Sequence, residues 1–296
     1  MRNILAIDIG GTNIKYGVIS LDGQILFKGS VETIRKGTEI LETIVKLFLD
    51  NKETYNLEGV GISSPGIINS DTGAMKVQGA LEDFNDFNLR DILRDRLKTN
   101  VEIENDAKCV VLAEKWLGNG KECETFLVMT IGTGVGGGAF INNKLHKGAD
   151  FMAGEIGFMI TSGINNNTPS NSTISNTCST YMLRRLYAQR TNKKIEDVSG
   201  EYVFEQAEKG DIHAQDQIVK FYESLSIALH NLYFILNPDK ILIGGGISVR
   251  EDIIYELKRR VDSYSSFGKD FVLERCEFSN DSGIIGAVKN YMDRVN

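Results

Sequence analysis

Residues that build metal centres and disulfide frameworks are scarce in this sequence. It contains four cysteines and three histidines among 296 residues, and no two cysteines stand at Cys-x-x-Cys spacing. We therefore interpret the cysteines as reduced thiols. No apolar run reaches the length of a membrane span, and a predicted strand begins at residue 3 without the features of a signal peptide. These absences predict a cytoplasmic protein with no membrane partner.

An excess of basic residues is also missing. The chain has 33 lysines and arginines against 40 acidic residues, for a net charge of −7. A surface that binds nucleic acid would need a basic patch, so we expect no nucleic-acid partner. The hydrophobic share of 42% and the charged share of 25% are typical of a globular protein. The length suits two domains with ample core.

Glycine, by contrast, is concentrated in one central stretch. Residues 129–139 begin as an apolar strand, break into a turn and continue as a second strand, with five glycines between positions 132 and 138. Glycine permits positive φ and lets backbone N–H groups approach a ligand closely. Successive N–H groups of this kind form a concavity that binds anions such as phosphate. A tight hairpin with glycine bulges is the alternative interpretation.

Two further glycine turns strengthen the phosphate interpretation. Gly10-Gly11-Thr12 separates two apolar strands near the N-terminus, which repeats the central pattern in the other half of the chain. Gly244-Gly245-Gly246 follows a buried strand at 240–243 and precedes a helix expected near 249–262. The duplicated pattern predicts two related lobes that each offer a loop to one ligand.

The remaining elements follow from periodicity and from turn residues. Asp106 stands near the start of one expected helix, where a lone Asp is more often an N-cap. A boundary at the glycines 118–120 divides the chain into lobes 1–117 and 118–282, with a last helix at about 283–296 expected to pack back on the first lobe. Strands are expected at 3–9, 13–20, 24–30, 57–62 and 101–103, helices at 37–50, 107–116, 178–189, 201–209 and 211–236, and loops at 69–88 and 161–177.

With these motifs the sequence resembles the ROK family of bacterial sugar kinases and related repressors over nearly its whole length. The resemblance implies an α/β, two-lobed actin-like ATPase fold (sugar kinase, heat-shock ATPase and actin) with a central cleft. The segments that carry it are residues 8–15, 64–66, 104–107, 131–136, 154–157, 244–246 and 283–287.

The same resemblance implies a role for each motif in phosphoryl transfer from ATP to a sugar. Asp106 would be the general base for the sugar hydroxyl. Asp8 would hold Mg²⁺ through water, because a hard cation prefers oxygen ligands and keeps several waters. The nucleotide would contact Gly10, Gly11, Thr12 and Lys15, then Gly132, Thr133 and Gly134, and finally Gly244, Gly245 and Gly246 at the adenosine. The sugar would contact Ser64, Gly66, Gly79, Asn105, Asp106 and Glu155.

Departures from the family pattern bear on the metal and on the substrate. Typical members carry a histidine where this chain has Phe158, and a Cys-x-Cys-Gly-x-x-Gly-Cys motif of which only Cys178 is present. A closed zinc site needs four ligands, so we expect no structural zinc. The acid that usually follows the last motif cysteine is Ser179 here. An imidazole and a carboxylate that would bind the sugar are therefore missing.

This loss favours a sugar substituted at its anomeric carbon. The chain is similar to zinc-less bacterial β-glucoside kinases, which phosphorylate the 6-hydroxyl of cellobiose and related glucosides. An N-acetylmannosamine kinase or glucokinase of the same family is the alternative. A non-catalytic sugar sensor or repressor is less expected, because no helix-turn-helix segment precedes the first strand, and an actin-like scaffold is disfavoured by Asn105-Asp106. Closed dimers are the commonest assembly, so a homodimer is expected.

Overall fold

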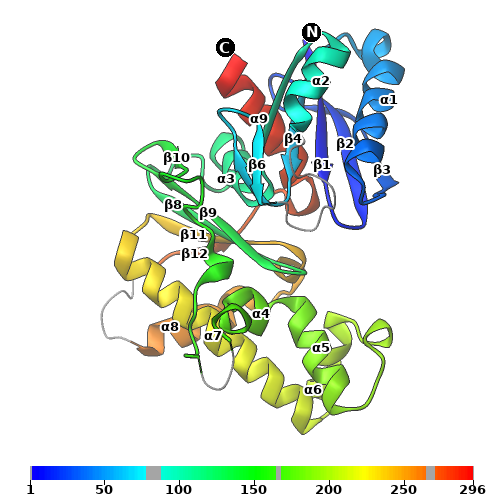
Figure 1. Cartoon of the computed structure of the whole chain (residues 1–296). Coiled ribbons are helices and arrows are strands. Elements are labelled where there is room, and N and C mark those ends of the chain that lie inside the picture. The colour runs from blue at the N-terminus through cyan, green and yellow to red at the C-terminus, as the bar shows by residue number, and fades with distance from the viewer. Residues whose placement is uncertain (1, 78–87, 165–167, 265–270, 296) are drawn as a thin grey trace. The chain divides into compact units, whose positions relative to one another are not determined.

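The computed structural model describes residues 2–77, 88–164, 168–264 and 271–295. It forms two compact units, each built around a five-stranded sheet (Figure 1). The first unit comprises Met1–Glu122, Leu145–Ala153 and Asn280–Asn296, and the second comprises Cys123–Lys144 and Gly154–Ser279. Within the described residues, no helix combines the length and the apolar character that crossing a bilayer requires.

The sheet of the first unit has the order β3-β2-β1-β4-β7. β1, β2 and β3 form an antiparallel meander, whereas β1, β4 and β7 run parallel. The carboxyl ends of these three parallel strands therefore lie along one edge of the sheet. The strands are β1 (Asn3–Ile9), β2 (Asn13–Ser20), β3 (Ile25–Glu32), β4 (Leu57–Ser64) and β7 (Asn100–Asn105).

The sheet of the second unit repeats this arrangement with the order β10-β9-β8-β11-β12. β8 and β9 are antiparallel, and β8, β11 and β12 are parallel. The two strand–glycine turn–strand motifs are therefore confirmed as hairpins that occupy matching places in the two sheets. The strands are β8 (Phe126–Ile131), β9 (Val135–Ile141), β10 (Lys144–His146), β11 (Lys240–Gly244) and β12 (Leu273–Arg275).

The central glycines do not all belong to one turn. Gly136, Gly137 and Gly138 lie within β9, and only residues 132–134 form the turn between the strands. A side chain at Gly137 would overlap the side chain of Ile156. The glycines inside β9 are thus partly explained by close packing rather than by ligand binding.

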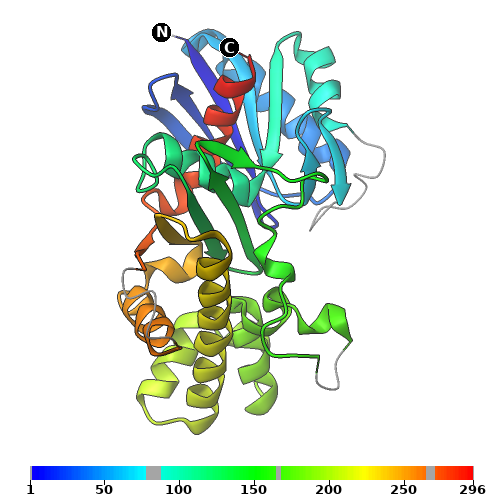
Figure 2. The same ribbon diagram turned by 90° about the vertical axis from the view of Figure 1, so that its left-hand side faces the viewer.

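Helices of the first unit pack on its sheet, and one of them comes from the C-terminal end of the chain. The helix α9 packs on β4 and α3, so the C-terminal residues lie beside strands from the N-terminal half (Figure 2). A side chain at Gly61 of β4 would overlap the backbone of α9, which shows how closely they approach. The helices are α1 (Gly37–Tyr55), α2 (Leu89–Leu97), α3 (Asp106–Trp116) and α9 (Ser282–Val295), beside a small hairpin of β5 (Ile67–Asn69) and β6 (Ala74–Val77).

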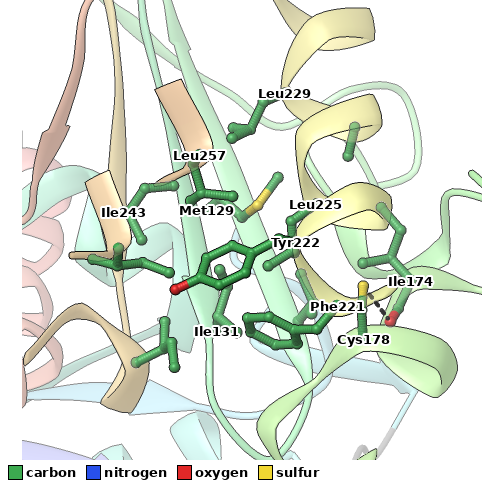
Figure 3. Close-up of a cluster of buried hydrophobic side chains, with 14 of the residues drawn as sticks. Met129, Ile131, Ile174, Cys178, Phe221, Tyr222, Leu225, Leu229, Ile243 and Leu257 are labelled. Carbon is green, nitrogen blue, oxygen red and sulfur yellow. Dashed lines mark hydrogen bonds between the residues drawn. The ribbon is translucent and has the colours of Figure 1, made fainter. Parts of the chain in front are cut away.

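The core of the second unit forms where α7 and α8 face the sheet. Figure 3 shows Met129 and Ile131 of β8 lying against Tyr222 and Leu225 of α7, and all four side chains are buried. The helices are α4 (Ile174–Cys178), α5 (Thr180–Arg190), α6 (Gly200–Glu208), α7 (Ile212–Leu236) and α8 (Ile253–Tyr264), with 3-10 turns η1 (Ile156–Phe158), η2 (Pro169–Ser172), η3 (Ile195–Asp197) and η4 (Gly246–Val249). A further 3-10 turn, η5 (Ser279–Asp281), begins at the last residue of the second unit and continues into the first.

Three expectations for this unit were wrong. The stretch 161–177 is not a plain loop, because it contains η2 and α4. The helix expected at 178–189 is broken at Ser179, whose side chain accepts a hydrogen bond from the N–H of Met182 and so begins α5. The helix expected from residue 249 begins only at Ile253, because η4 intervenes.

Candidate active site

The carboxyl edge of the first sheet places four of its polar residues in one row. Lys15 pairs with Asp8 between β2 and β1, Asp8 pairs with Ser63 of β4, and Ser63 pairs with Glu104 of β7. Ligands of open α/β sheets bind beyond this edge. Asp106 follows directly after β7 at the same edge. The register therefore brings Asp8 and Asp106, far apart in the sequence, to one side of the first unit.

Asp8 is partly buried and closely surrounded by other residues. Burial raises the pKa of its carboxyl group, while the hydroxyl of Ser63 and the charge of Lys15 lower it. Ser63 Oγ donates to Asp8 Oδ1 at 2.6 Å. A side chain at Gly283, where α9 begins, would overlap the Asp8 carboxylate. Asp8 is thus fixed by its neighbours and still has a charged lysine nearby.

The donors around Asp8 fit a magnesium ion that is held mainly by its own water and by substrate. Among the described residues, no cluster of three or more His, Cys, Asp or Glu side chains could hold a metal ion. Mg²⁺ is commonly bound by one or two carboxylates together with substrate phosphates, rather than by a cage of protein ligands. A single carboxylate at the edge of the sheet, as Asp8 is, matches that mode.

Asn105 and Asp106 form a connected pair at the start of α3. Asn105 is the N-cap, because its Oδ1 accepts from the N–H of Lys108 at 3.0 Å. Its Nδ2 donates to the carbonyl of Gly66 at 2.9 Å and to Asp106 Oδ1 at 3.0 Å. Asp106 Oδ1 also accepts from the N–H of Ala107 at 2.7 Å. The capping role expected of Asp106 therefore belongs to Asn105, and Asp106 is the exposed first residue of the helix.

Behind this pair lies an ionic contact that the sequence analysis did not identify. Glu104 is fully buried; one carboxylate oxygen accepts from the N–H of Asn105 at 2.9 Å, and the other lies 3.3 Å from Lys147 Nζ. Lys147 also donates to Ser70 Oγ at 2.6 Å. Lys147 belongs to the segment 145–153, which is part of the first unit although both its flanks belong to the second.

A second lysine, which is buried, holds the same segment. Lys108 is nearly inaccessible, and its Nζ donates to the carbonyl of Phe151 at 2.9 Å. Phe151 has φ of 64°, a left-handed conformation that is unfavourable for an aromatic residue. Lys108, which precedes the apolar residues 109–111 of α3, was the only sequence signal for this contact. These lysines fix the loop that leads into Gly154 and Glu155.

Two of the predicted nucleotide loops meet within the second unit. A pocket of about 370 Å³ is lined by Gly132 and Thr133 of the central turn and by Gly246 of the third glycine turn. Its walls also contain Glu201 and Phe204 of α6. Gly134, Gly244 and Gly245 are not among its lining residues. Gly134 closes the turn by accepting from Gly132, Gly244 ends β11, and Gly245, with φ of 79°, lies against the backbone of Ile131.

The candidate sugar residues divide between the two units. Glu155 is half-buried just before η1 in the second unit, and Phe158 at the end of η1 is 61% exposed. In the first unit, Ser64 is fully buried and donates to the Pro65 carbonyl at 3.3 Å, whereas Pro65 and Gly66 are partly accessible. Gly79 lies outside the described residues.

The residues at the place of the usual zinc motif serve packing. The thiol of Cys178 is buried in the core of the second unit and donates to the carbonyl of Ile174 (Figure 3). Burial raises the pKa of Cys178 to about 12. Ser179 is buried as the cap of α5 and supplies no carboxylate.

Comparisons with known proteins match this chain over nearly its full length. The sequence profile of the ROK family matches residues 4–293. The β-glucoside kinase of Listeria monocytogenes is 37% identical over 293 residues, which cover 99% of this chain and 98% of that protein.

Solved structures extend the agreement to the fold. Lmo2764 from Listeria monocytogenes, proposed to be an N-acetylmannosamine kinase, has a TM-score of 0.93 at 37% identity and covers 99% of this chain and 100% of its own. A ROK family protein of Streptococcus pneumoniae TIGR4, in complex with sucrose, has a TM-score of 0.87 at 28% identity, with 99% of each chain covered. The α/β, actin-like ATPase fold expected from the sequence is confirmed.

Proposed function

Because the chain belongs to the ROK family and is an ATP-dependent sugar phosphotransferase, we propose that it phosphorylates the 6-hydroxyl of a β-glucoside such as cellobiose. The observation that carries the proposal is the Asn105-Asp106 pair. Asp106 is exposed at the carboxyl edge of the sheet, and one of its oxygens is oriented by Asn105 and by the N–H of Ala107. A carboxylate oriented in this way suits a general base.

In the proposed reaction the oxygen of the sugar 6-hydroxyl forms a bond to the γ-phosphorus of ATP, and Asp106 accepts the proton of that hydroxyl. The bond between that phosphorus and the β–γ bridging oxygen breaks, and ADP leaves with the electron pair. Phosphoryl transfer depends mainly on positioning and charge stabilisation. Asn105 would contribute to the positioning of Asp106, because its side chain links Asp106 to the loop at Gly66. Glu155 would bind sugar hydroxyls.

The nucleotide would be held by backbone amides together with Lys15. Gly10, Gly11, Thr12 and Lys15 would hold phosphates, as would Gly132, Thr133 and Gly134. Gly244, Gly245 and Gly246 would lie at the adenosine. For Gly246 this is supported by the pocket that it lines together with Gly132 and Thr133. Asp8 would hold Mg²⁺ through water, and the ion supplies neutralisation of phosphate charge.

The preference for a glucoside over a free hexose is supported by two side chains of the second unit. Phe158 presents an exposed aromatic surface next to Glu155, where typical family members have an imidazole. Ser179 is occupied by its capping bond and supplies no carboxylate. An apolar face suits a substituted anomeric carbon better than a free hydroxyl, because an unmatched hydroxyl loses its hydrogen bonds on burial.

A coupled ADP-release assay across cellobiose, gentiobiose, salicin, glucose and N-acetylmannosamine tests this preference. We expect the highest kcat/KM with the three glucosides. Turnover of free hexoses alone would overturn the glucoside assignment, and N-acetylmannosamine as the best substrate would favour the activity proposed for Lmo2764.

Phe158→His gives a second, sharper test of the same preference. The imidazole supplies a hydrogen-bonding group toward a free anomeric hydroxyl, so we expect the ratio of glucose to cellobiose kcat/KM to rise by roughly tenfold. Phe234→His on α7 serves as the control, because Phe234 is also exposed in the same unit but lies on another helix. An unchanged ratio in Phe158→His would remove this residue from the substrate site.

A further inference from the structure

The segment that follows β3 donates a hydrogen bond to the backbone carbonyl of each residue in the first glycine turn, Gly10-Gly11-Thr12. Thr33 Oγ1 donates to the carbonyl of Gly10 at 2.8 Å, and Arg35 Nε donates to the carbonyl of Gly11 at 2.9 Å. The N–H of Thr33 donates to the carbonyl of Thr12 at 2.9 Å. Three consecutive carbonyl groups therefore point toward one short segment of the same unit.

This arrangement determines where the N–H groups of the turn point. A trans peptide is planar, so the N–H of each residue points away from the carbonyl of the residue before it. The N–H groups of Gly11 and Thr12 must then face away from residues 33–35. Within the part of the chain that the structure describes, neither N–H donates to a backbone or side-chain acceptor. Two outward N–H groups of this kind form an anion-binding concavity.

Arg35 differs from Thr33 because it brings a charge to the carbonyl that it contacts. Its guanidinium group is exposed, and no carboxylate pairs with it among the described residues. A charged donor makes a stronger hydrogen bond than a neutral one. Hydrogen bonds also polarise the groups they join, so a cation on the Gly11 carbonyl increases the positive character of the Thr12 N–H.

We propose that Arg35 is a positioning residue for the nucleotide phosphates, which acts through the Gly11–Thr12 peptide rather than by touching the nucleotide. It turns the Thr12 N–H outward, whereas Thr33 does so for the Gly11 N–H, and it polarises the peptide whose N–H would donate to phosphate. The ligand class is a nucleoside di- or triphosphate. The inference rests on the proposed function for the nucleotide loop but not on the identity of the sugar.

Isothermal titration calorimetry with ADP, with the non-hydrolysable ATP analogue AMPPNP and with adenosine tests the proposal. We expect Arg35→Met to weaken ADP and AMPPNP binding by about five- to tenfold, because one charge-assisted hydrogen bond is lost. Adenosine binding should stay within about twofold, because adenosine has no phosphate to meet the loop. Arg35→Lys keeps a charged donor and should recover most of the loss.

Two control variants separate this role from general effects. Lys36→Met removes the exposed charge next to Arg35. Within the described residues Lys36 makes no hydrogen bond to the glycine turn, so this variant should leave the affinities for ADP, AMPPNP and adenosine nearly unchanged. Thr33→Val removes a neutral donor to Gly10 and should cost less than Arg35→Met.

Four outcomes would overturn the proposal. They are wild-type ADP affinity in Arg35→Met, an equal loss of ADP and adenosine affinity in that variant, no recovery in Arg35→Lys, or an equal loss in Lys36→Met. Wild-type protein that binds ADP but turns over no sugar would contradict the proposed function instead, while leaving the Arg35 comparison interpretable.

Discussion

The variant Asp106→Asn should lose turnover by about a hundredfold to ten-thousandfold, the range that a positioned general base contributes. The amide keeps an oxygen for the N–H of Ala107, which donates to the Asp106 carboxylate at 2.7 Å, so the start of α3 should be preserved. It cannot accept the hydroxyl proton as a carboxylate does. Binding of ADP and of cellobiose should remain within a few-fold of wild type, because neither depends on proton transfer. The ADP-release assay measures kcat, and calorimetry measures the two affinities.

Asp95→Asn is the matched control for this change. Asp95 is an exposed acid on α2 of the same unit, so its substitution removes the same charge at a distance from the carboxyl edge of the sheet. We expect wild-type kcat in this variant. A kcat for Asp106→Asn within a few-fold of wild type would show that another group accepts the proton.

The largest loss of stability is expected from Gly286→Ala in α9. A methyl group there would overlap the backbone carbonyl of Cys109 in α3, and a backbone atom cannot rotate away as a side chain can. Ala in a helix interior normally stabilises relative to Gly by roughly 0.5–1 kcal/mol, but overpacking costs about 1–3 kcal/mol or more. We expect a net loss of about 2 kcal/mol and a fall in Tm of roughly 4–8 °C.

Differential scanning calorimetry without nucleotide measures this change. Gly246→Ala is the control, because nothing lies within 4 Å of a methyl group at that position. Its Tm should stay near the wild-type value. Equal Tm values for Gly286→Ala and wild type would mean that α9 is not packed against α3 as closely as the structure has it.

Local sequence patterns predicted helices and strands best where the apolar periodicity ended at a glycine turn. The β1–β2 and β8–β9 hairpins were identified because apolar alternation stops at a glycine turn in each. The break at Ser179 was missed, because the stretch before it is rich in serine, threonine and asparagine, and many of these residues could be caps. Asn105 and Asp106 could likewise each be the N-cap of α3, and the hydrogen bond from the Lys108 N–H to Asn105 identifies Asn105 as the cap.

The contacts behind the site could not be predicted from local patterns. Glu104 and Lys147 are paired although they lie far apart in sequence, and an ion pair of this kind leaves no periodic signature. The same holds for Arg35 on the Gly11 carbonyl, which depends on how the segment after β3 returns to the first glycine turn. The roles expected of single glycines came from the family resemblance, and neither spacing nor periodicity distinguished Gly246, which lines the pocket, from Gly245, which lies against Ile131.

The position of the new phosphate on the product tests the central claim most directly. Incubation with ATP, Mg²⁺ and cellobiose, followed by two-dimensional ¹H–³¹P NMR, reports which carbon carries the phosphate. We predict a correlation to the two H6 protons of the non-reducing glucose ring, present in wild type and Asp95→Asn and lost in Asp106→Asn. Phosphate on any other carbon, no sugar phosphate at all, or the same product yield from Asp106→Asn would contradict the account.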